Sequence, residues 1–542
     1  MENLNGLDKN VSDTRAQSAD KAYRVFGYVA LALVSVMLAG HAFYYFCHPS
    51  LTYGDQAIYI ESARLILEGK APYVQFWDWN PPLIMYLNVL PVAISGLFGG
   101  NLILSFNIFV LFLCFLGAAL AVQLEQRYAP RREFVFFLPV VLVAVAFTCL
   151  STISYGEREH LFVLAFLPYF VLRSLRWRGR SPARRISINT GLLAGLMLCL
   201  KPQFFIAAAA MELALWRYYA PAKERLKSVF WSFENKTILA VALAYGLALL
   251  GLPQGSRDVF FGEILPFYGP GYEFSQRSLM YMLRGDDQIL RPVLFSFVGM
   301  LAAFVCYTWS PRIAALGAFC AVGLFNYFYG NQAWIYRLVP AEFAALLIFA
   351  EIAMTGVRRY LVMQGKTRAP GHQAVLLLLT ALGTLYFCAN DIVESGVKYR
   401  AAGAEQKIRQ DKYPDMDALA KVIAGSTTST DSVLYLGTGI SPGYPAILQA
   451  RRSPAARYMY SVLPQIEACT INHKEQKWKD LLQTHVSNYR ADIQNNKPAL
   501  IILQSIPIIG ILEKEGLMSE IRANYKEMDG QKLEGLTLLK RL

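Results

Sequence analysis

Long apolar stretches recur along this 542-residue chain and constrain its fold more than any other feature. About 20 apolar residues in a row are enough to cross the hydrocarbon core of a bilayer as an α-helix. Only 17% of the residues are charged, whereas a soluble globular domain is about 25% charged. The sequence therefore predicts a polytopic α-helical membrane protein with about eleven spans. The predicted spans are residues 25–47, 102–123, 135–153, 161–173, 186–200, 203–217, 238–252, 293–309, 313–329, 337–355 and 373–389.

The distribution of basic residues favours one orientation. Lys and Arg gather in short loops such as 173–185, 217–236 and 358–368, as is typical of cytoplasmic loops. With a cytoplasmic N-terminus these loops all fall inside, and residues 48–101 form one outside loop. Its apolar part, Pro82–Phe98, is then an interfacial helix rather than a span. We expect a multi-pass protein of a bacterial inner membrane.

Three regions follow from this topology. We expect residues 1–24 to be a polar, disordered cytoplasmic N-terminus, and residues 25–389 to form a transmembrane catalytic domain that includes the outside loop. Residues 390–542 are expected to form an extracytoplasmic (periplasmic) α/β domain. Within it, Ser432–Leu436 and Ala499–Leu503 have the apolar pattern of buried strands. Glu475–Asp492 has the pattern of an amphipathic helix.

Composition also bears on partners and cofactors. The net charge of +13 resides in loops next to apolar segments, so we expect membrane lipid and no nucleic acid as a partner. The scattered His and Cys residues do not favour a zinc site. Carboxylates are the ligands that Mg²⁺ and Mn²⁺ prefer. A divalent cation is therefore a candidate cofactor, with Asp55 and Glu157 as its first ligands and Asp78 and Glu159 as further ones.

Acidic residues gather in the predicted outside loops. Asp55 follows the first span, Asp78 lies in an aromatic-rich stretch, and Glu157 and Glu159 flank Arg158 in a short loop. A carboxylate beside a membrane bundle is costly unless it is solvated, paired or used. Because a carboxylate can deprotonate an acceptor hydroxyl, Asp55 and Glu157 are our candidate catalytic residues.

Cations on the same predicted side are suited to phosphate, which Arg binds through a bidentate fork. We expect Lys201, Arg158 and Arg337 to bind a donor phosphate. The candidate substrate-binding residues are Asp78, Asn80, Glu159, His160, Tyr268, Arg277 and Tyr336.

Each candidate also has a structural alternative. Asp55 has the residue type of a helix N-cap, and Asp78 is compatible with an ordinary loop acid. Residues 157–159 are compatible with a solvated turn that contains an internal ion pair. Lys201 is long enough to extend to the lipid headgroups, and Arg337 has the position of an interface anchor. The placement of all of these residues on one side favours a functional site.

Several motifs occur in a fixed order along residues 25–355. They are Gly54-Asp55, Ala63–Gly69, Pro81-Pro82-Leu83, Glu157, Lys201, and Tyr336-Arg337 with Pro340. In these residues the chain resembles the GT-C superfamily of membrane glycosyltransferases, which includes protein O-mannosyltransferases and the bacterial enzyme that adds aminoarabinose to lipid A.

The resemblance implies inverting transfer of a sugar from a polyprenyl-phosphate donor on the outer face of the membrane, with Asp55 as the catalytic carboxylate. Asn80 stands where the aminoarabinose transferase has a Lys. Phosphate contact would therefore fall to Lys201, Arg158 or an arginine of the 253–292 loop.

We therefore expect a glycosyltransferase that acts on a cell-envelope glycan, glycolipid or protein. The alternative is a transporter or flippase for a lipid-linked saccharide, and a third hypothesis is a non-catalytic assembly scaffold. A transporter predicts internal repeats and ionisable residues near the membrane midplane, and the sequence shows neither pattern.

Overall fold

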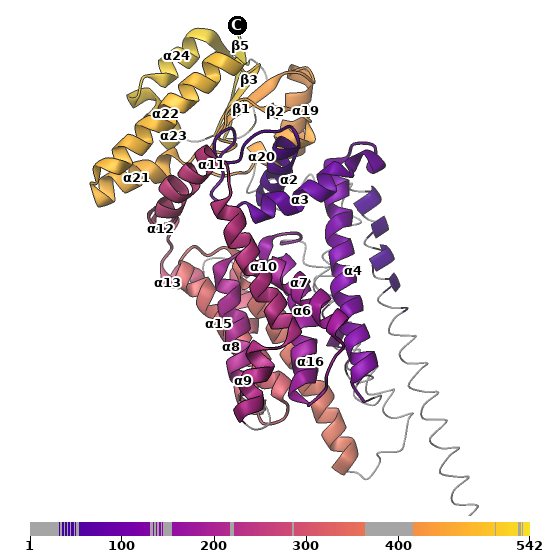
Figure 1. Cartoon of the computed structure of the whole chain (residues 1–542). Helices are drawn as coiled ribbons and strands as arrows, with labels where there is room; N and C mark the ends of the chain where they lie inside the picture. Colours follow the sequence, from indigo (N-terminus) through magenta and orange to yellow (C-terminus); the bar gives the residue numbers. More distant parts are fainter. Residues whose placement is uncertain are drawn as a thin grey trace, which may run out of the picture. The chain divides into compact units, whose positions relative to one another are not determined.

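The computed structural model describes residues 54–130, 154–216, 222–284, 287–363, 416–504, 506–528 and 535–542, with single residues between 32 and 49, between 134 and 144, and at 533 (Figure 1). The chain forms two compact units. We call the first the bundle unit, which comprises Met1–His48, Asn107–Tyr245 and Ser278–Gly396. We call the second the sheet unit, which comprises Pro49–Phe106, Gly246–Arg277 and Val397–Leu542.

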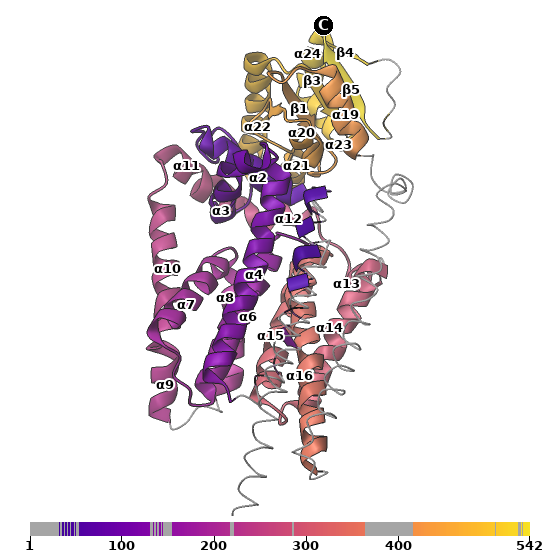
Figure 2. The same ribbon diagram turned by 90° about the vertical axis from the view of Figure 1, so that its right-hand side faces the viewer.

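Long helices make up the described part of the bundle unit, and α4 and α10 each continue into the sheet unit at one end. The helices are α4 (Leu102–Tyr128), α6 (Arg158–Trp177), α7 (Arg184–Leu198), α8 (Pro202–Leu215), α9 (Ala222–Phe230), α10 (Phe233–Leu250), α13 (Leu279–Arg284), α14 (Asp287–Cys306), α15 (Pro311–Gly330) and α16 (Val339–Met363), with a 3₁₀ turn, η4 (Ile335–Leu338), before α16. In the turned view, α14, α15 and α16 run side by side (Figure 2).

Five stretches among the described residues are long and apolar enough to cross a membrane, which confirms the membrane class. They are Leu102–Tyr128, Phe233–Leu250, Ile289–Cys306, Pro311–Gly330 and Ile335–Gly356. The figure of eleven spans stays a prediction. The predicted spans 25–47 and 135–153 lie mostly outside the described residues, and 373–389 lies wholly outside them. The 15-residue α7 and the 14-residue α8 are shorter than a span normally needs.

Small residues allow the bundle helices to approach closely. A Cβ atom added at Gly299 would lie 2.5 Å from the Cβ of Ala345, and one at Gly323 would lie 2.9 Å from the backbone nitrogen of Ala341. Close backbone contact through small residues is the usual basis of helix packing in membranes, where apolar surface alone gives little driving force. These glycines therefore fix α14 and α15 against α16.

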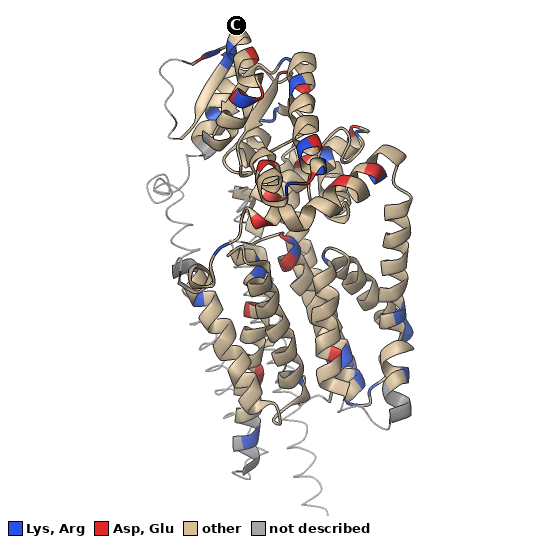
Figure 3. Ribbon diagram, turned by 90° about the vertical axis from the view of Figure 1, so that its left-hand side faces the viewer, with Lys and Arg blue, Asp and Glu red and all other residues tan. Residues whose placement is uncertain are grey.

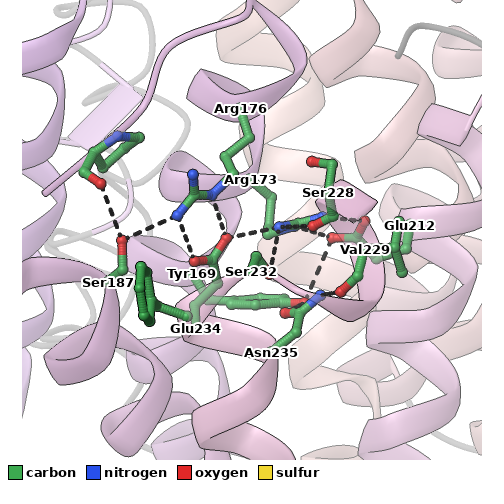
Figure 4. Close-up of polar contacts among 12 residues, drawn as sticks. Tyr169, Arg173, Arg176, Ser187, Glu212, Ser228, Val229, Ser232, Glu234 and Asn235 are labelled. Atoms are coloured by element: carbon green, nitrogen blue, oxygen red, sulfur yellow. Dashed lines mark hydrogen bonds and ion pairs between the residues drawn. The ribbon is translucent and has the colours of Figure 1, made fainter. Parts of the chain in front are cut away.

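Most charged positions of the bundle unit lie near helix ends, with long uncharged stretches between them (Figure 3). Near the end of α6 lies a group that we call the closed ion cluster, formed by Arg173, Arg176, Glu212 and Glu234. Arg173 donates to Glu212 Oε2 at 2.9 Å and to Glu234 Oε1 at 2.7 Å. Arg176 donates to both oxygens of Glu234 at 2.6 and 2.8 Å (Figure 4). The cluster thus links α6, α8 and α10 with two cations and two anions.

The sheet unit contains a five-stranded sheet in the order β2-β1-β3-β5-β4. Its strands are β1 (Ser432–Leu436), β2 (Ser453–Pro454), β3 (Leu500–Leu503), β4 (Tyr525–Glu527) and β5 (Thr537–Arg541). β1 pairs in parallel with β2 and β3, whereas β5 pairs antiparallel with β3 and β4. The two predicted strands are confirmed as β1 and β3.

Helices accompany the sheet: α19 (Met416–Ser426), α20 (Gly443–Gln449), α21 (Leu463–His473), α22 (Gln476–Asn496), α23 (Ile506–Lys514) and α24 (Leu517–Asn524). The predicted amphipathic helix is confirmed as α22. It buries Trp478, Leu482, Val486 and Tyr489, which recur at the three- and four-residue spacing of one helix face.

Two segments distant in sequence from the sheet complete this unit. They carry α2 (Gly54–Leu67), α3 (Leu83–Ala93) and η1 (Ser95–Phe98) in one segment, and α11 (Gln254–Val259), the π-helical turn η3 (Phe260–Ile264) and α12 (Leu265–Glu273) in the other. The backbone nitrogen of Trp77 donates to the carbonyl of Arg457 at 2.8 Å. Ser256 Oγ donates to the carbonyl of Pro72 at 2.7 Å. The segment between α2 and α3 therefore packs against residues 254–273 and against the C-terminal region.

The predicted helix over Pro82–Phe98 is confirmed as α3 followed by η1. With 11 residues, α3 is about 16 Å long, roughly half of what a bilayer requires. This length agrees with the interpretation that the segment is not a span.

Candidate functional site

Asp55 lies in the first turn of α2, at a place where close packing requires glycine before it. A Cβ at Gly54 would lie 2.5 Å from Cγ2 of Ile440, in the loop that follows β1. The next residues, Gln56 and Ala57, are buried, whereas Asp55 keeps partial exposure. Because Asp55 lies inside the helix rather than before it, it does not occupy the N-cap position. Its carboxylate is at the accessible edge of a buried helix start.

Asp78 is fully buried, and both of its oxygens accept hydrogen bonds. Tyr460 donates its hydroxyl to Oδ1 at 2.7 Å, and Asn80 donates its amide to Oδ2 at 2.9 Å. Burial, followed by the nearby charges of Asp78 and Asp55, raises the pKa of Tyr460 well above its usual value. The phenol therefore stays protonated and continues to donate. Asn80 serves here as a partner of Asp78.

Aromatic rings surround this part of the loop. Trp79 stacks on Phe267 and on Tyr272, with ring centroids 5.2 and 5.0 Å apart. Tyr268 meets Tyr272 edge to face at 4.8 Å. Stacked aromatic pairs add to the stabilisation from buried area, so the rings hold the Trp79 stretch against α12. Arg277, near the end of the same segment, is exposed.

In the bundle unit, a tight turn sets the start of α6. Gly156 has a φ of +79°, a left-handed conformation that glycine adopts without strain. Its backbone nitrogen donates to Nδ1 of His160 at 3.1 Å, which closes the turn. Glu157, Arg158, Glu159 and His160 are all buried. The alternative of a solvated turn is therefore wrong.

Lys201 lies in the short connection between α7 and α8, and its conformation follows from the next residue. Pro202 disfavours a helical conformation in the residue before it, and Lys201 is extended, with φ −149° and ψ 132°. Its ammonium donates to Oε1 of Glu159 and lies 5.1 Å from the ring centre of Tyr336. With 4% of its surface exposed, Lys201 is held inside the protein.

Arg337 reaches the same region because the end of α15 leaves room for it. A Cβ atom at Gly330 would lie 1.7 Å from Nη1 of Arg337, so a larger residue there would move the guanidinium from its present place. The guanidinium lies 4.6 Å from the ring centre of Trp334, a favourable distance for a cation–π contact. Asn331 follows in a left-handed conformation with φ 52° and turns the chain towards η4. The end of α15 thus determines where Arg337 points.

We call Arg158, Glu159, Lys201 and Arg337 the open ion cluster. Burial is the main cause that lowers the pKa of Lys201 to about 8; the charges of Arg158 and Arg337 act in the same direction, and Glu159 opposes them. This set holds three cations and one carboxylate, and a second carboxylate, that of Glu157, precedes it in the sequence. An excess of positive charge at a buried place favours the binding of an anion.

A small cavity, which we call the Glu159 hollow, adjoins the open ion cluster. Its volume is about 20 Å³, room for one or two water-sized groups. It is lined by Glu159, Phe162, Gln203, Phe204, Ala207, Gly323, Asn326, Arg337 and Pro340. Neither Gln203 nor Asn326 is among the predicted site residues. Gln203 could have been noticed as a polar residue two places after Lys201, and Asn326 as a polar residue within the predicted span 313–329.

The structure divides the predicted residues between the two units. Glu157, Arg158, Glu159, His160, Lys201, Tyr336 and Arg337 belong to the bundle unit, and Asp55, Asp78, Asn80, Tyr268 and Arg277 belong to the sheet unit. Within the part of the chain that the structure describes, no three His, Cys, Asp or Glu side chains gather in a metal-binding arrangement.

Two of the solved structures that are similar to this chain are structures of ArnT. Apo ArnT from Cupriavidus metallidurans matches with a TM-score of 0.51 and 13% identity, over 97% of this chain and 98% of that one. The chain has the fold of this ArnT structure. The same protein bound to undecaprenyl phosphate matches with a TM-score of 0.48 and 13% identity, over 96% of this chain and 97% of that one. No protein-family model matches the sequence, and neither does any curated protein. The ArnT likeness thus concerns the fold of nearly the whole chain.

Proposed function

We propose that this protein is a glycosyltransferase that moves a sugar from a polyprenyl-phosphate donor to a cell-envelope glycan, glycolipid or protein. The transfer takes place on the outer face of a bacterial inner membrane and inverts the anomeric centre. The ArnT-like fold over nearly the whole chain supports this proposal, as do the motifs shared with the GT-C superfamily.

The open ion cluster is the observation that carries the proposal. Arg158 and Arg337 each act electrostatically on Lys201, whose ammonium donates to the carboxylate of Glu159. Apolar residues including Phe162 and Phe204 line the adjoining hollow. A lipid phosphate that leaves with the electrons of the broken bond gains negative charge, and preorganised cations in a low-dielectric site stabilise it. Lys201 is the first candidate for this contact.

In the proposed reaction, a hydroxyl oxygen of the acceptor forms a bond to C1 of the sugar as the bond from C1 to the phosphate oxygen breaks. The electron pair of that bond leaves with the polyprenyl phosphate, and the proton of the acceptor hydroxyl goes to Asp55. The partial exposure of Asp55 supports this role. Glu157 is the proposed second carboxylate of the active site.

The remaining features of the proposal come from sequence. The positive-inside pattern supports a cytoplasmic N-terminus and a periplasmic sheet unit. A divalent cation remains part of the proposal, and a chelator that lowers the transfer rate, with recovery on adding Mg²⁺ or Mn²⁺, would support it.

The test is Asp55→Asn in the purified full-length protein, supplied with a polyprenyl-phosphate hexose labelled in its sugar and with envelope membranes from cells that lack the protein. We expect the transfer rate to fall by roughly 100- to 10,000-fold, as for loss of a general base, with unchanged membrane insertion and melting temperature. Asp480→Asn, at an exposed position of α22, is the matched control. Normal transfer by Asp55→Asn would remove Asp55 from the mechanism. Movement of labelled lipid between leaflets without any transfer by the wild-type protein would favour the flippase alternative.

A further inference from the structure

We propose that the Glu159 hollow binds a neutral hydroxyl group of the donor's sugar through Glu159, Gln203 and Asn326. This inference rests on the proposed function for the existence of a lipid-linked sugar donor. It adds the class of sugar: one that carries a hydroxyl, rather than an amine, at the position that enters the hollow.

The first observation is an oxygen that the protein leaves without a donor. Glu159 Oε1 accepts from Lys201. Glu159 Oε2 is buried and has no hydrogen-bond partner among the described residues, and Glu159 as a whole is 3% exposed. A buried acceptor without a donor is costly. Because Glu159 lines the hollow, a ligand group placed there can supply the missing hydrogen bond.

The second observation is the chemistry of the opposite lining. Gln203 lies in the first turn of α8 and Asn326 lies on α15, and these two helices pack together. Each amide both donates and accepts hydrogen bonds. A hydroxyl group matches this set, because it can donate to the carboxylate of Glu159 and accept from an amide. The volume of about 20 Å³ suits a single group of this size.

The third observation concerns charge. The hollow shares Glu159 with Lys201 and is lined by Arg337. A protonated amine in the hollow would bring a further cation beside these two, and like charges repel strongly where little water screens them. A hydroxyl group carries no charge and avoids this repulsion. The phosphate of the same donor is attracted by the cations, so the two ends of the head group are recognised separately.

The apolar lining supports the same assignment. Phe162 and Phe204 stack with their ring centres 4.1 Å apart, and both line the hollow. Pockets that select small molecules typically combine apolar walls with a few polar groups at fixed positions. The stacked rings hold the first turn of α8 in place, and with it Gln203.

The experiment compares binding of three probes to the purified full-length protein in lipid nanodiscs. The probes are undecaprenyl phosphate, undecaprenyl phosphate carrying a neutral hexose, and analogues in which one ring hydroxyl at a time is replaced by an amine. We expect the wild-type protein to bind the neutral hexosyl lipid more tightly than the sugar-free lipid. An amine at one ring position should weaken binding by about tenfold or more.

Variants of the lining residues test whether the hollow causes the tighter binding of the hexosyl lipid. Gln203→Met and Asn326→Leu should each weaken binding of the hexosyl lipid by roughly three- to tenfold, the usual effect of losing one hydrogen bond. Binding of undecaprenyl phosphate should not change. Gln123→Leu, at an exposed position of α4, is the matched control and should change neither.

Four outcomes would overturn the inference. An equal loss for both lipids would mean that Gln203 and Asn326 contact the phosphate or the tail. No loss for either lipid would mean that the hollow holds only water. Equal binding of every amine analogue would remove the preference for a neutral sugar. Failure of the wild-type protein to bind any of the lipids would overturn the proposed function itself, and this result is distinct from the other three.

Discussion

Two buried groups of charges lie towards opposite ends of α6, and they are built differently. In the closed ion cluster, Arg173 and Arg176 face Glu212 and Glu234 in equal numbers through paired hydrogen bonds. In the open ion cluster, Arg158 and Arg337 both act electrostatically on Lys201, and Lys201 donates to Glu159 beside a hollow. Balanced, enclosed charges join helices in the closed ion cluster, whereas the open ion cluster lies beside a cavity and is where we propose that the donor phosphate binds.

The largest expected effect is on the stability of the closed ion cluster. Arg173→Met removes the fully buried cation and leaves the Glu212 carboxylate without its bidentate partner. Breaking a buried ion pair typically lowers the free energy of unfolding by about 3–5 kcal/mol. Melting of the purified protein measures this, with the exposed Arg180→Met as the control. Donor affinity of the folded fraction should stay normal, and an unchanged melting curve would show that the cluster does not join the helices.

The matching change in the open ion cluster should affect binding more than stability. Lys201→Met is expected to weaken binding of a polyprenyl-phosphate donor by roughly 100-fold, because a buried cation is lost from the phosphate. Lys201→Arg should retain part of the affinity. The melting temperature of Lys201→Met should fall less than that of Arg173→Met, because Arg337, which lines the same hollow as Glu159, remains in place.

Donor affinity should be measured by titration, with the exposed Lys227→Met as the control. Unchanged affinity in Lys201→Met would move the phosphate site to the arginines and would leave Lys201 as a structural residue. The two clusters would then no longer differ in function.

The lowered pKa of Lys201 makes the donor affinity of the open ion cluster and the stability of the protein depend on pH. The folded pKa is about 8, below the usual 10.5, so the ammonium loses its proton as the pH rises through 8. Donor affinity should then fall, by up to about tenfold per pH unit. Between pH 8 and 10.5 the unfolded chain binds more protons than the folded one, so the stability of the ligand-free protein should rise. Lys201→Arg should abolish both trends, and parallel changes of affinity and stability in the wild-type protein would contradict this assignment.

The smallest expected effect concerns how much each arginine of the closed ion cluster contributes to stability. Arg176→Met removes the outer cation, whose side chain is 15% exposed, but Glu234 keeps its hydrogen bond to Arg173. We expect a loss of only about 1 kcal/mol in the free energy of unfolding. The same melting experiment measures it. A loss as large as that of Arg173→Met would mean that the two arginines act as one unit.

Local sequence patterns predicted the elements whose signal lies within a few residues. The apolar run of β1 and the helical spacing of α22 are examples. The short strands β2, β4 and β5 escaped prediction, because two or three residues or a partly exposed run carry no clear alternation. The sequence also did not predict that Pro49–Phe106 and Gly246–Arg277 belong to the sheet unit. This depends on contacts between residues far apart in the sequence.

The candidate site was predictable to a similar degree. That Glu159, Lys201 and Tyr336 come together follows from the predicted placement of their loops on one side of the membrane. The pairing of Asp78 with Tyr460 could not be foreseen, because it joins two segments with no motif in common. Gln203 and Asn326 could be assigned to the candidate site only from the packing of α8 on α15.

The hydrogen bond between Asp78 and Tyr460 has a consequence for biosynthesis. Its two residues are separated by 382 positions, so the ribosome has made most of the chain before the early loop can acquire this partner. Until then, a carboxylate destined for burial and the ring of Trp77, which contacts Tyr458 and His485, must stay solvated or sheltered by other means. The emerging polypeptide thus delays completion of its N-terminal loop until its C-terminal region arrives, and a nascent chain stopped before Tyr460 would keep Asp78 without its phenolic donor.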